Sequence, residues 1–108
     1  MFKYSPTSDT SGTSKLCHLL STDNMLLLED ITPEKLANTF GERKIKFYEW
    51  ERGYTDPEWM FKTDSGEVVG FGFRWGNVRL RGRNLSQETA NSFIKSALSM
   101  INITLSRS

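Results

Sequence analysis

The stretch from Trp59 to Asn84, WMFKTDSGEVVGFGFRWGNVRLRGRN, constrains this chain most, because it combines two tight turns with alternating apolar residues. The first turn is Asp64–Gly66. Asp and Ser favour a type I turn, and Gly adopts the left-handed conformation that closes a three-residue loop. This turn predicts an antiparallel hairpin with Thr63 opposite Glu67, Phe61 opposite Val69 and Trp59 opposite Phe71.

The second turn is assigned to Gly76-Asn77, because both residue types accept the positive φ that a two-residue hairpin loop requires. It predicts a second hairpin that shares its first strand with the preceding one. The resulting pairs are Trp75 opposite Val78, Phe73 opposite Leu80 and Phe71 opposite Gly82.

The two turns predict the same apolar face of the sheet. Residues directly opposite each other share a face, and a shift of one residue would exchange the two faces. The predicted apolar face consists of Trp59, Phe61, Val69, Phe71, Phe73, Trp75, Val78 and Leu80.

The opposite face carries glycines and arginines. In the predicted register Arg74 faces Arg79, a like-charge pair that costs a few tenths of a kcal/mol or more. Gly72 lies between Glu58 and Arg81, and Gly70 lies between Met60 and Arg83. We therefore expect a shallow trough with a glycine floor and arginine walls. Its predicted binding residues are Arg74, Arg79, Arg81, Arg83, Glu58, Gly70 and Gly72, and the nearby aromatic residues Trp50 and Tyr48 could line a cleft or a dimer contact.

Two helices have recognisable ends. Thr32 and Pro33 provide a cap and a first helical residue, and Gly41 ends a short helix near residues 33–40. A longer helix begins after Asn84 or Ser86. Its apolar stripe, which should cover the aromatic face of the sheet, consists of Ala90, Phe93, Ile94, Ala97, Leu98 and Ile101.

Two further strands complete the predicted fold. Arg43–Arg52 has strand residues with apolar side chains on both faces, and Met25–Glu29 resembles a buried strand. The fold class is α+β: a two-layer sandwich in which a curled antiparallel sheet of four to five strands packs against the long C-terminal helix.

The 108 residues fit a single domain. Residues 1–14 are rich in Ser and Thr and predict a mobile N-terminal arm, and residues 15–108 form the α+β domain. The formal net charge of +1 disfavours general polyanion binding, so that any anion site must be local. One cysteine, Cys17, and no long apolar run predict a cytoplasmic protein without a membrane span.

No arrangement of residues specifies catalysis, a metal or a cofactor. Cys17 and His18 are adjacent, so on a strand they would face opposite sides, and a buried structural role is the simpler interpretation. The acid pairs Glu49/Glu51 and Asp56/Glu58 alternate with bases and resemble a solvated charge ladder. Gly70–Gly72 lies within a strand and therefore cannot be a phosphate loop.

We expect a small binding module, and the residues favour a non-enzymatic role over catalysis. The module would self-associate as a homodimer, or bind a protein partner, through the sheet face opposite the C-terminal helix or through the edge strand Val78–Arg83. The alternative is nucleic acid or a phosphorylated ligand in the arginine trough. An enzyme that uses His18, Cys17 or the carboxylates ranks third.

Overall fold

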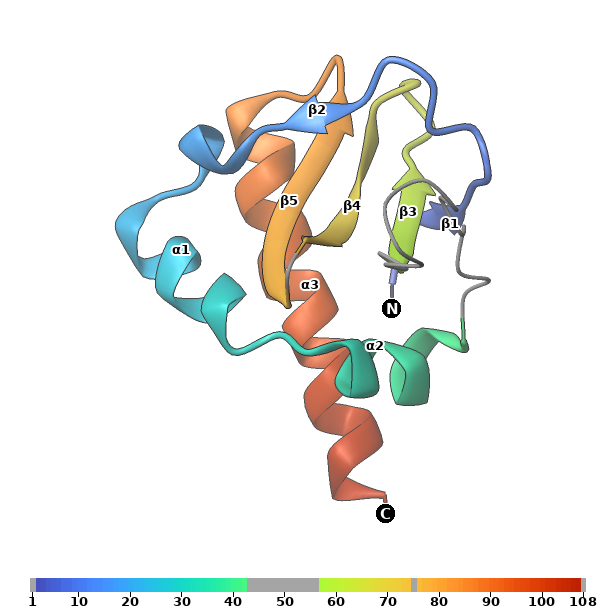
Figure 1. Ribbon diagram of the computed structural model, residues 1–108, viewed down its shortest axis with the longest axis vertical. Coiled ribbons are helices and arrows are strands. Elements are labelled where there is room, and N and C mark those ends of the chain that lie inside the picture. The colour runs from blue at the N-terminus through green and yellow to red at the C-terminus, as the bar shows by residue number, and fades with distance from the viewer. Residues whose placement is uncertain (1, 43–56, 75, 108) are drawn as a thin grey trace.

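The computed structural model describes residues 2–42, 57–74 and 76–107. Within these residues, one open antiparallel sheet has the strand order β1-β3-β4-β5-β2 (Figure 1). The strands are β1 (Ser5–Pro6), β2 (Ser14–Lys15), β3 (Glu58–Lys62), β4 (Val68–Arg74) and β5 (Asn77–Arg83). The helices are the 3-10 turn η1 (Cys17–Leu19), α1 (Thr22–Glu29), α2 (Pro33–Phe40) and α3 (Gln87–Ser106). The predicted α+β arrangement is confirmed.

The first hairpin has the predicted register. Trp59 pairs with Phe71 and Phe61 with Val69, and the amide of Thr63 donates to the carbonyl of Glu67 at 2.9 Å. Gly66 has a φ of +89°, the left-handed conformation for which glycine was expected. The sequence of this turn therefore determined the alignment of β3 with β4.

The second hairpin has a different register, and our prediction of it is wrong by two residues. Arg74 pairs with Asn77, so the loop consists of positions 75 and 76 rather than Gly76-Asn77. Gly76 supplies the positive φ, at +80°, and Asn77 is the first residue of β5. This register separates Arg74 from Arg79, which pairs with Gly72 instead, and so avoids the predicted like-charge contact. A shift of two residues leaves the apolar face unchanged.

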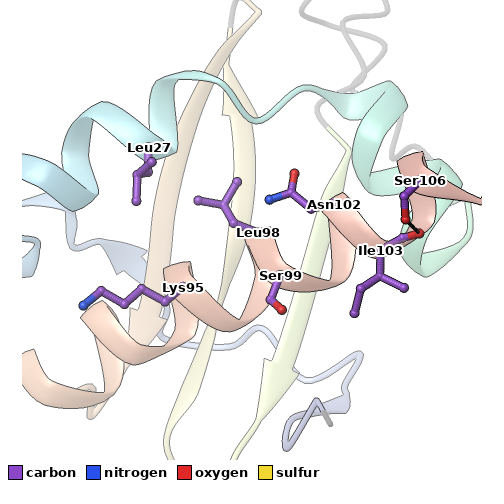
Figure 2. Close-up of a pocket in the computed structure, with 7 residues that line it drawn as sticks. All are labelled: Leu27, Lys95, Leu98, Ser99, Asn102, Ile103 and Ser106. Carbon is purple, nitrogen blue, oxygen red and sulfur yellow. Dashed lines mark hydrogen bonds between the residues drawn. The ribbon is translucent and has the colours of Figure 1, made fainter.

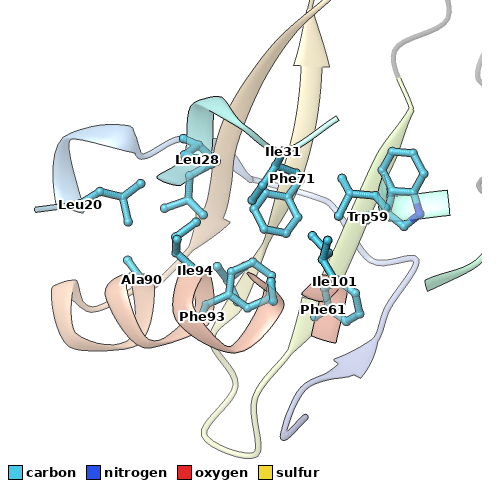
Figure 3. Packing of buried hydrophobic residues seen from close by; sticks show 14 of the residues in the cluster. Leu20, Leu28, Ile31, Trp59, Phe61, Phe71, Ala90, Phe93, Ile94 and Ile101 are labelled. Atoms are coloured by element: carbon cyan, nitrogen blue, oxygen red, sulfur yellow. The ribbon is translucent and has the colours of Figure 1, made fainter. Parts of the chain in front are cut away.

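The core lies between that apolar face and α3, as the alternating pattern predicted. Phe61 and Phe71 from the sheet pack with Phe93 and other residues of the α3 stripe (Figure 3). Leu80 of β5 belongs to the same buried cluster. The ring centroids of Phe71 and Phe93 lie 5.0 Å apart. At roughly 1.5–3 kcal/mol per buried large side chain, this layer provides the main driving force of the fold.

Both predicted helix starts are present. The Thr32 side chain accepts from the amide of Lys35, and the Ser86 side chain accepts from the amide of Thr89. Gly41 follows the last residue of α2 with a φ of +89°. These caps satisfy amides that have no partner within their own helices.

The predicted strand Met25–Glu29 is wrong, because these residues belong to α1. Ser21 caps this helix by accepting from the amide of Asn24, and the Asn24 side-chain amide donates to Asn91 of α3 at 2.7 Å. A short apolar run fits either a strand or a helix, and the polar residues before it decided the outcome as a helix cap. The predicted strand Arg43–Arg52 lies outside the described residues.

The segment for which we expected a mobile arm, residues 1–14, contributes β1 and the first residue of β2, and these are the two edge strands. Ser5 pairs with Lys62 on β3, and Ser14 pairs with Gly82 on β5. Between them the chain arches from one edge of the sheet to the other, as the blue segment in Figure 1 shows. We call residues 7–13 the strap. Phe2 precedes β1 and packs against the core, with its ring centroid 5.2 Å from that of Phe61.

Candidate binding surface on the sheet opposite α3

The sheet face opposite α3 carries the predicted arginines, and part of it is buried. Met60 and Val68 are only 2% and 3% exposed, and Gly70 and Gly72 are also buried. Exposure increases toward the hairpin at position 76: Arg79 is half-buried and Arg74 is exposed. An open glycine floor, as we expected it, is therefore absent from this face.

Side chains of the protein itself fill the space above the two glycines. A Cβ atom at Gly72 would lie 2.6 Å from Cδ of Arg81, and one at Gly70 would lie 2.7 Å from Sδ of Met60. Glycine inside a strand usually marks a close approach of another group. Here the approaching groups belong to the adjacent strands β5 and β3.

Arg81 has two partners in the described part of the chain. Its Nε lies 3.7 Å from a carboxylate oxygen of Glu58, and its Nη2 donates to the carbonyl of Thr13 at 3.2 Å. The predicted contact of Glu58 with Arg81 over Gly72 is therefore present, although Arg81 pairs with Gly70 in the sheet. The side chain reaches Glu58 because it extends diagonally across Gly72.

Arg83 holds the middle of the strap. Its Nη1 donates to the carbonyl of Ser11 and, at 3.1 Å, to the Ser11 hydroxyl, and its Nη2 donates to the Asp9 carboxylate at 3.4 Å. Hydrogen bonds from the Ser11 side chain and from Arg83 lower the pKa of Asp9 to about 2. Asp9 is exposed, so solvent screens this ion pair.

Arg79 and Arg74 differ from the other two arginines. The side chain of neither forms a hydrogen bond or an ion pair within residues 2–42, 57–74 and 76–107. Both stand on the same face as Arg81 and Arg83, beyond the end of the strap. We call these four arginines the arginine ladder. Within the described residues, the side chains of two of them contact the protein's own oxygen atoms and the other two do not.

The remaining candidates do not converge on a reacting centre in the described structure. His18 is exposed on η1, next to the half-buried thiol of Cys17. Among the described residues no group of three or more His, Cys, Asp or Glu side chains is placed to hold a metal ion. Trp50, Tyr48 and the acids Glu49, Glu51 and Asp56 lie outside the described residues, as does Trp75.

Comparison of the chain with family models, curated proteins and solved structures gives no significant match. Among the described residues, no helix has both the length and the apolar character that a bilayer span requires.

Sequence reasoning missed the residues that contact the arginines from the strap. These are Asp9, Ser11 and Thr13. One signal was present: Asp9 is the only acid in the first 22 residues. Two carbonyl groups supply much of the remaining contact, and backbone carbonyls have no sequence signature.

Proposed function

We propose that this protein is a non-enzymatic interaction module that binds an extended acidic segment of a protein partner along the arginine ladder. One observation carries the proposal: the strap already lies against Arg81 and Arg83 in the way such a segment would. It offers them two backbone carbonyls and one carboxylate. Charge-assisted hydrogen bonds of this kind are stronger than neutral ones.

Arg79 and Arg74 would receive the partner. They continue the ladder past the strap and have no partner of their own in the described structure. Arginine is enriched at protein interfaces because its planar group makes several directed hydrogen bonds. The lone free thiol of Cys17 favours a reducing compartment, so we place this binding in the cytoplasm.

Nucleic acid remains the competing ligand for the same cations. Single-strand binding normally adds aromatic side chains on which bases stack. Here Trp59, Phe71 and Phe73 are buried on the α3 side of the sheet, away from the arginines. This arrangement favours a peptide over a nucleic-acid strand. A small ligand in a trough is also disfavoured, because the side chains of Arg81 and Met60 fill the space above Gly72 and Gly70.

A titration with two labelled probes tests the proposal. The probes are an oligoglutamate peptide and an oligothymidine strand of equal charge, with fluorescence anisotropy as the readout. We expect the peptide to bind the wild-type chain. The double variant Arg74→Glu/Arg79→Glu should bind it about tenfold more weakly, because two exposed ion pairs of about 0.7 kcal/mol each amount to about 1.4 kcal/mol.

The matched control compares the single variants Arg79→Glu and Lys3→Glu, which change the net charge equally; Lys3 is exposed and lies away from the ladder. Lys3→Glu should keep most of the affinity. Equal losses in the two single variants would show that only net charge matters and would reject the ladder as a site. Tighter binding of oligothymidine than of oligoglutamate would instead select the nucleic-acid alternative.

A further inference from the structure

The helix α1 is apolar on more sides than the protein covers. Its sequence, TDNMLLLE, places Leu28 in the core at 2% exposure, whereas Leu26 is 59% exposed and Leu27 is 37% exposed. A helix that is apolar around most of its circumference normally belongs in a buried setting. Because Asn24 and Leu28 fix α1 against the rest of the fold, Leu26 and Leu27 cannot both turn inward.

A groove runs between α1 and the outer side of α3. Leu27 forms one wall, and α3 contributes the other lining residues (Figure 2). The volume of the groove is about 560 Å³. Those residues are Lys95, Leu98, Ser99, Asn102, Ile103 and Ser106. Ile103 is 43% exposed. An apolar centre with a rim of small polar residues is the usual composition of a protein interface.

The two helices beside this groove carry opposite charge. On α1, Asp23 and the cap Asp30 lie four residues before and three residues after Leu27, on the same side of the helix, whereas Glu29 lies on the other side; α1 contains no Lys or Arg. Along α3, the charged residues after Glu88 are both basic: Lys95 and, at the end of the helix, Arg107. None of these five side chains forms an ion pair within the described residues, and Lys35 donates only to the backbone carbonyl of Asp30.

We infer that the groove between α1 and α3 is the interface of a homodimer, with a second copy of this chain as its occupant. In a two-fold symmetric dimer the α1 of each copy meets the α3 of the other. The acidic helix then faces the basic helix twice, while Leu26, Leu27 and Ile103 are buried at the centre. Because each copy carries both the acidic and the basic helix, two copies can pair without a charged group from any other molecule.

This dimer differs from the one that the sequence suggested. We expected self-association through the arginine face or the edge strand Val78–Arg83, but β2 pairs with β5 from Ser14 to Lys15, and the amide of Leu16 donates to Leu80 at 2.9 Å. The α1–α3 groove lies on the helical layer, so that the arginine ladder stays accessible in the dimer. The inference is thus independent of the proposed function.

Sedimentation velocity of the full chain over a wide range of concentration tests the inference. We expect a monomer–dimer equilibrium for the wild type. Leu26→Asp and Ile103→Asp should each weaken the dimer about tenfold or more, because each places two uncompensated charges in the interface. Both positions are exposed in the monomer, so circular dichroism should show unchanged helix content.

Charge reversal provides the sharper test. Asp30→Lys and Lys95→Glu should each weaken the dimer, and the double variant Asp30→Lys/Lys95→Glu should restore it, since the facing charges then exchange sign. Asp64→Lys, in the exposed turn of the first hairpin, is the matched control and should leave the dimer unchanged.

Three outcomes would overturn the inference. A wild-type chain that stays monomeric at every concentration has no such dimer. A dimer insensitive to all four groove substitutions uses another surface. A monomer that binds vesicles of phosphatidylcholine and phosphatidylglycerol through Leu26 and Ile103 would assign the groove to a membrane surface instead.

Discussion

Gly70 and Gly72 occupy alternate positions on β4, and each leaves space for a different neighbour. At Gly72 the neighbour is the flexible Arg81 side chain, 2.6 Å from the position of a Cβ. At Gly70 a Cβ would also lie 2.2 Å from the carbonyl oxygen of Trp59 and 2.7 Å from Cα of Met60, which are backbone atoms. A side chain can move away from an added methyl group, whereas a paired strand cannot.

We therefore predict unequal effects of alanine at these two glycines. Gly70→Ala should lower the free energy of unfolding by about 3 kcal/mol or more, because β3 must shift. Gly72→Ala should cost about 1 kcal/mol or less, because Arg81 can swing away and its partly exposed ion pair with Glu58 contributes little. Urea denaturation measures both. Equal losses would show that the side chain above Gly72 is as rigid as the strand beside Gly70.

Glu67 connects the first hairpin to the start of α3. Its carboxylate accepts from the amide of Ser86 at 2.9 Å, from the Thr89 hydroxyl at 3.0 Å and from the Ser65 hydroxyl at 3.0 Å. Burial raises the pKa of Glu67, but these hydrogen bonds outweigh it and hold the pKa below its ordinary value of 4.5. The negative charge also lies near the positive end of the α3 dipole.

A lowered pKa means that ionised Glu67 stabilises the fold above pH 4.5 and that this contribution is lost as the pH falls through the folded-state pKa. Glu67→Gln should therefore cost about 1–2 kcal/mol at neutral pH. The difference from wild type should shrink at a pH of about 3. Urea denaturation at both pH values provides the measurement, and the exposed acid Glu42, changed to Gln, is the control. A difference that does not vary with pH would contradict the role of the charge.

At the scale of elements, the two hairpins show what a turn sequence can determine. The sequence Asp64–Gly66 favours one placement of the turn, and the hairpin register predicted from it is confirmed. Around Gly76, both Trp75-Gly76 and Gly76-Asn77 offer a two-residue loop, and the choice depends on cross-strand contacts such as Arg79 with Gly72. Patterns that repeat every two residues identify the faces of a strand but leave a shift of two undecided.

The strap and both edge strands could not be predicted from the sequence. β1 and β2 each contain two residues, too few to show a period. Their pairing relies on backbone hydrogen bonds and on contacts of the arginines with carbonyl oxygens, and neither leaves a side-chain pattern. For the candidate site, the sequence therefore indicated the arginines but not what already occupies two of them.

Covering the β3 edge should matter for solubility. We predict that a chain lacking residues 2–6 loses β1 and the packing of Phe2, and associates in a concentration-dependent way through the exposed edge of β3. Light scattering measures this association. The control variant Ser5→Ala/Pro6→Ala keeps the backbone of β1 and should not associate in this way. A truncated chain that scatters no more light than this control would show that the edge is protected by other means.

At the scale of the whole molecule, the two proposed surfaces lie on opposite layers of the sandwich. The arginine ladder belongs to the sheet face away from α3, and the α1–α3 groove belongs to the helical layer. A dimer formed through the helical layer would present two ladders at once. If both proposals hold, such a dimer would bind a partner with two acidic segments more tightly than either site alone, because the second contact would be intramolecular.

The pairing of the first residues with late ones also governs how this chain can fold. Ser5 meets Lys62 and Ser14 meets Gly82, so neither edge strand has a template until the central hairpins exist. Docking the strap brings together residues that are far apart in the sequence, and the chain loses conformational entropy before the hydrogen bonds of the strap form. During synthesis the N-terminal segment therefore waits unpaired while most of the protein emerges, and docking of the strap belongs to the end of folding rather than to its beginning.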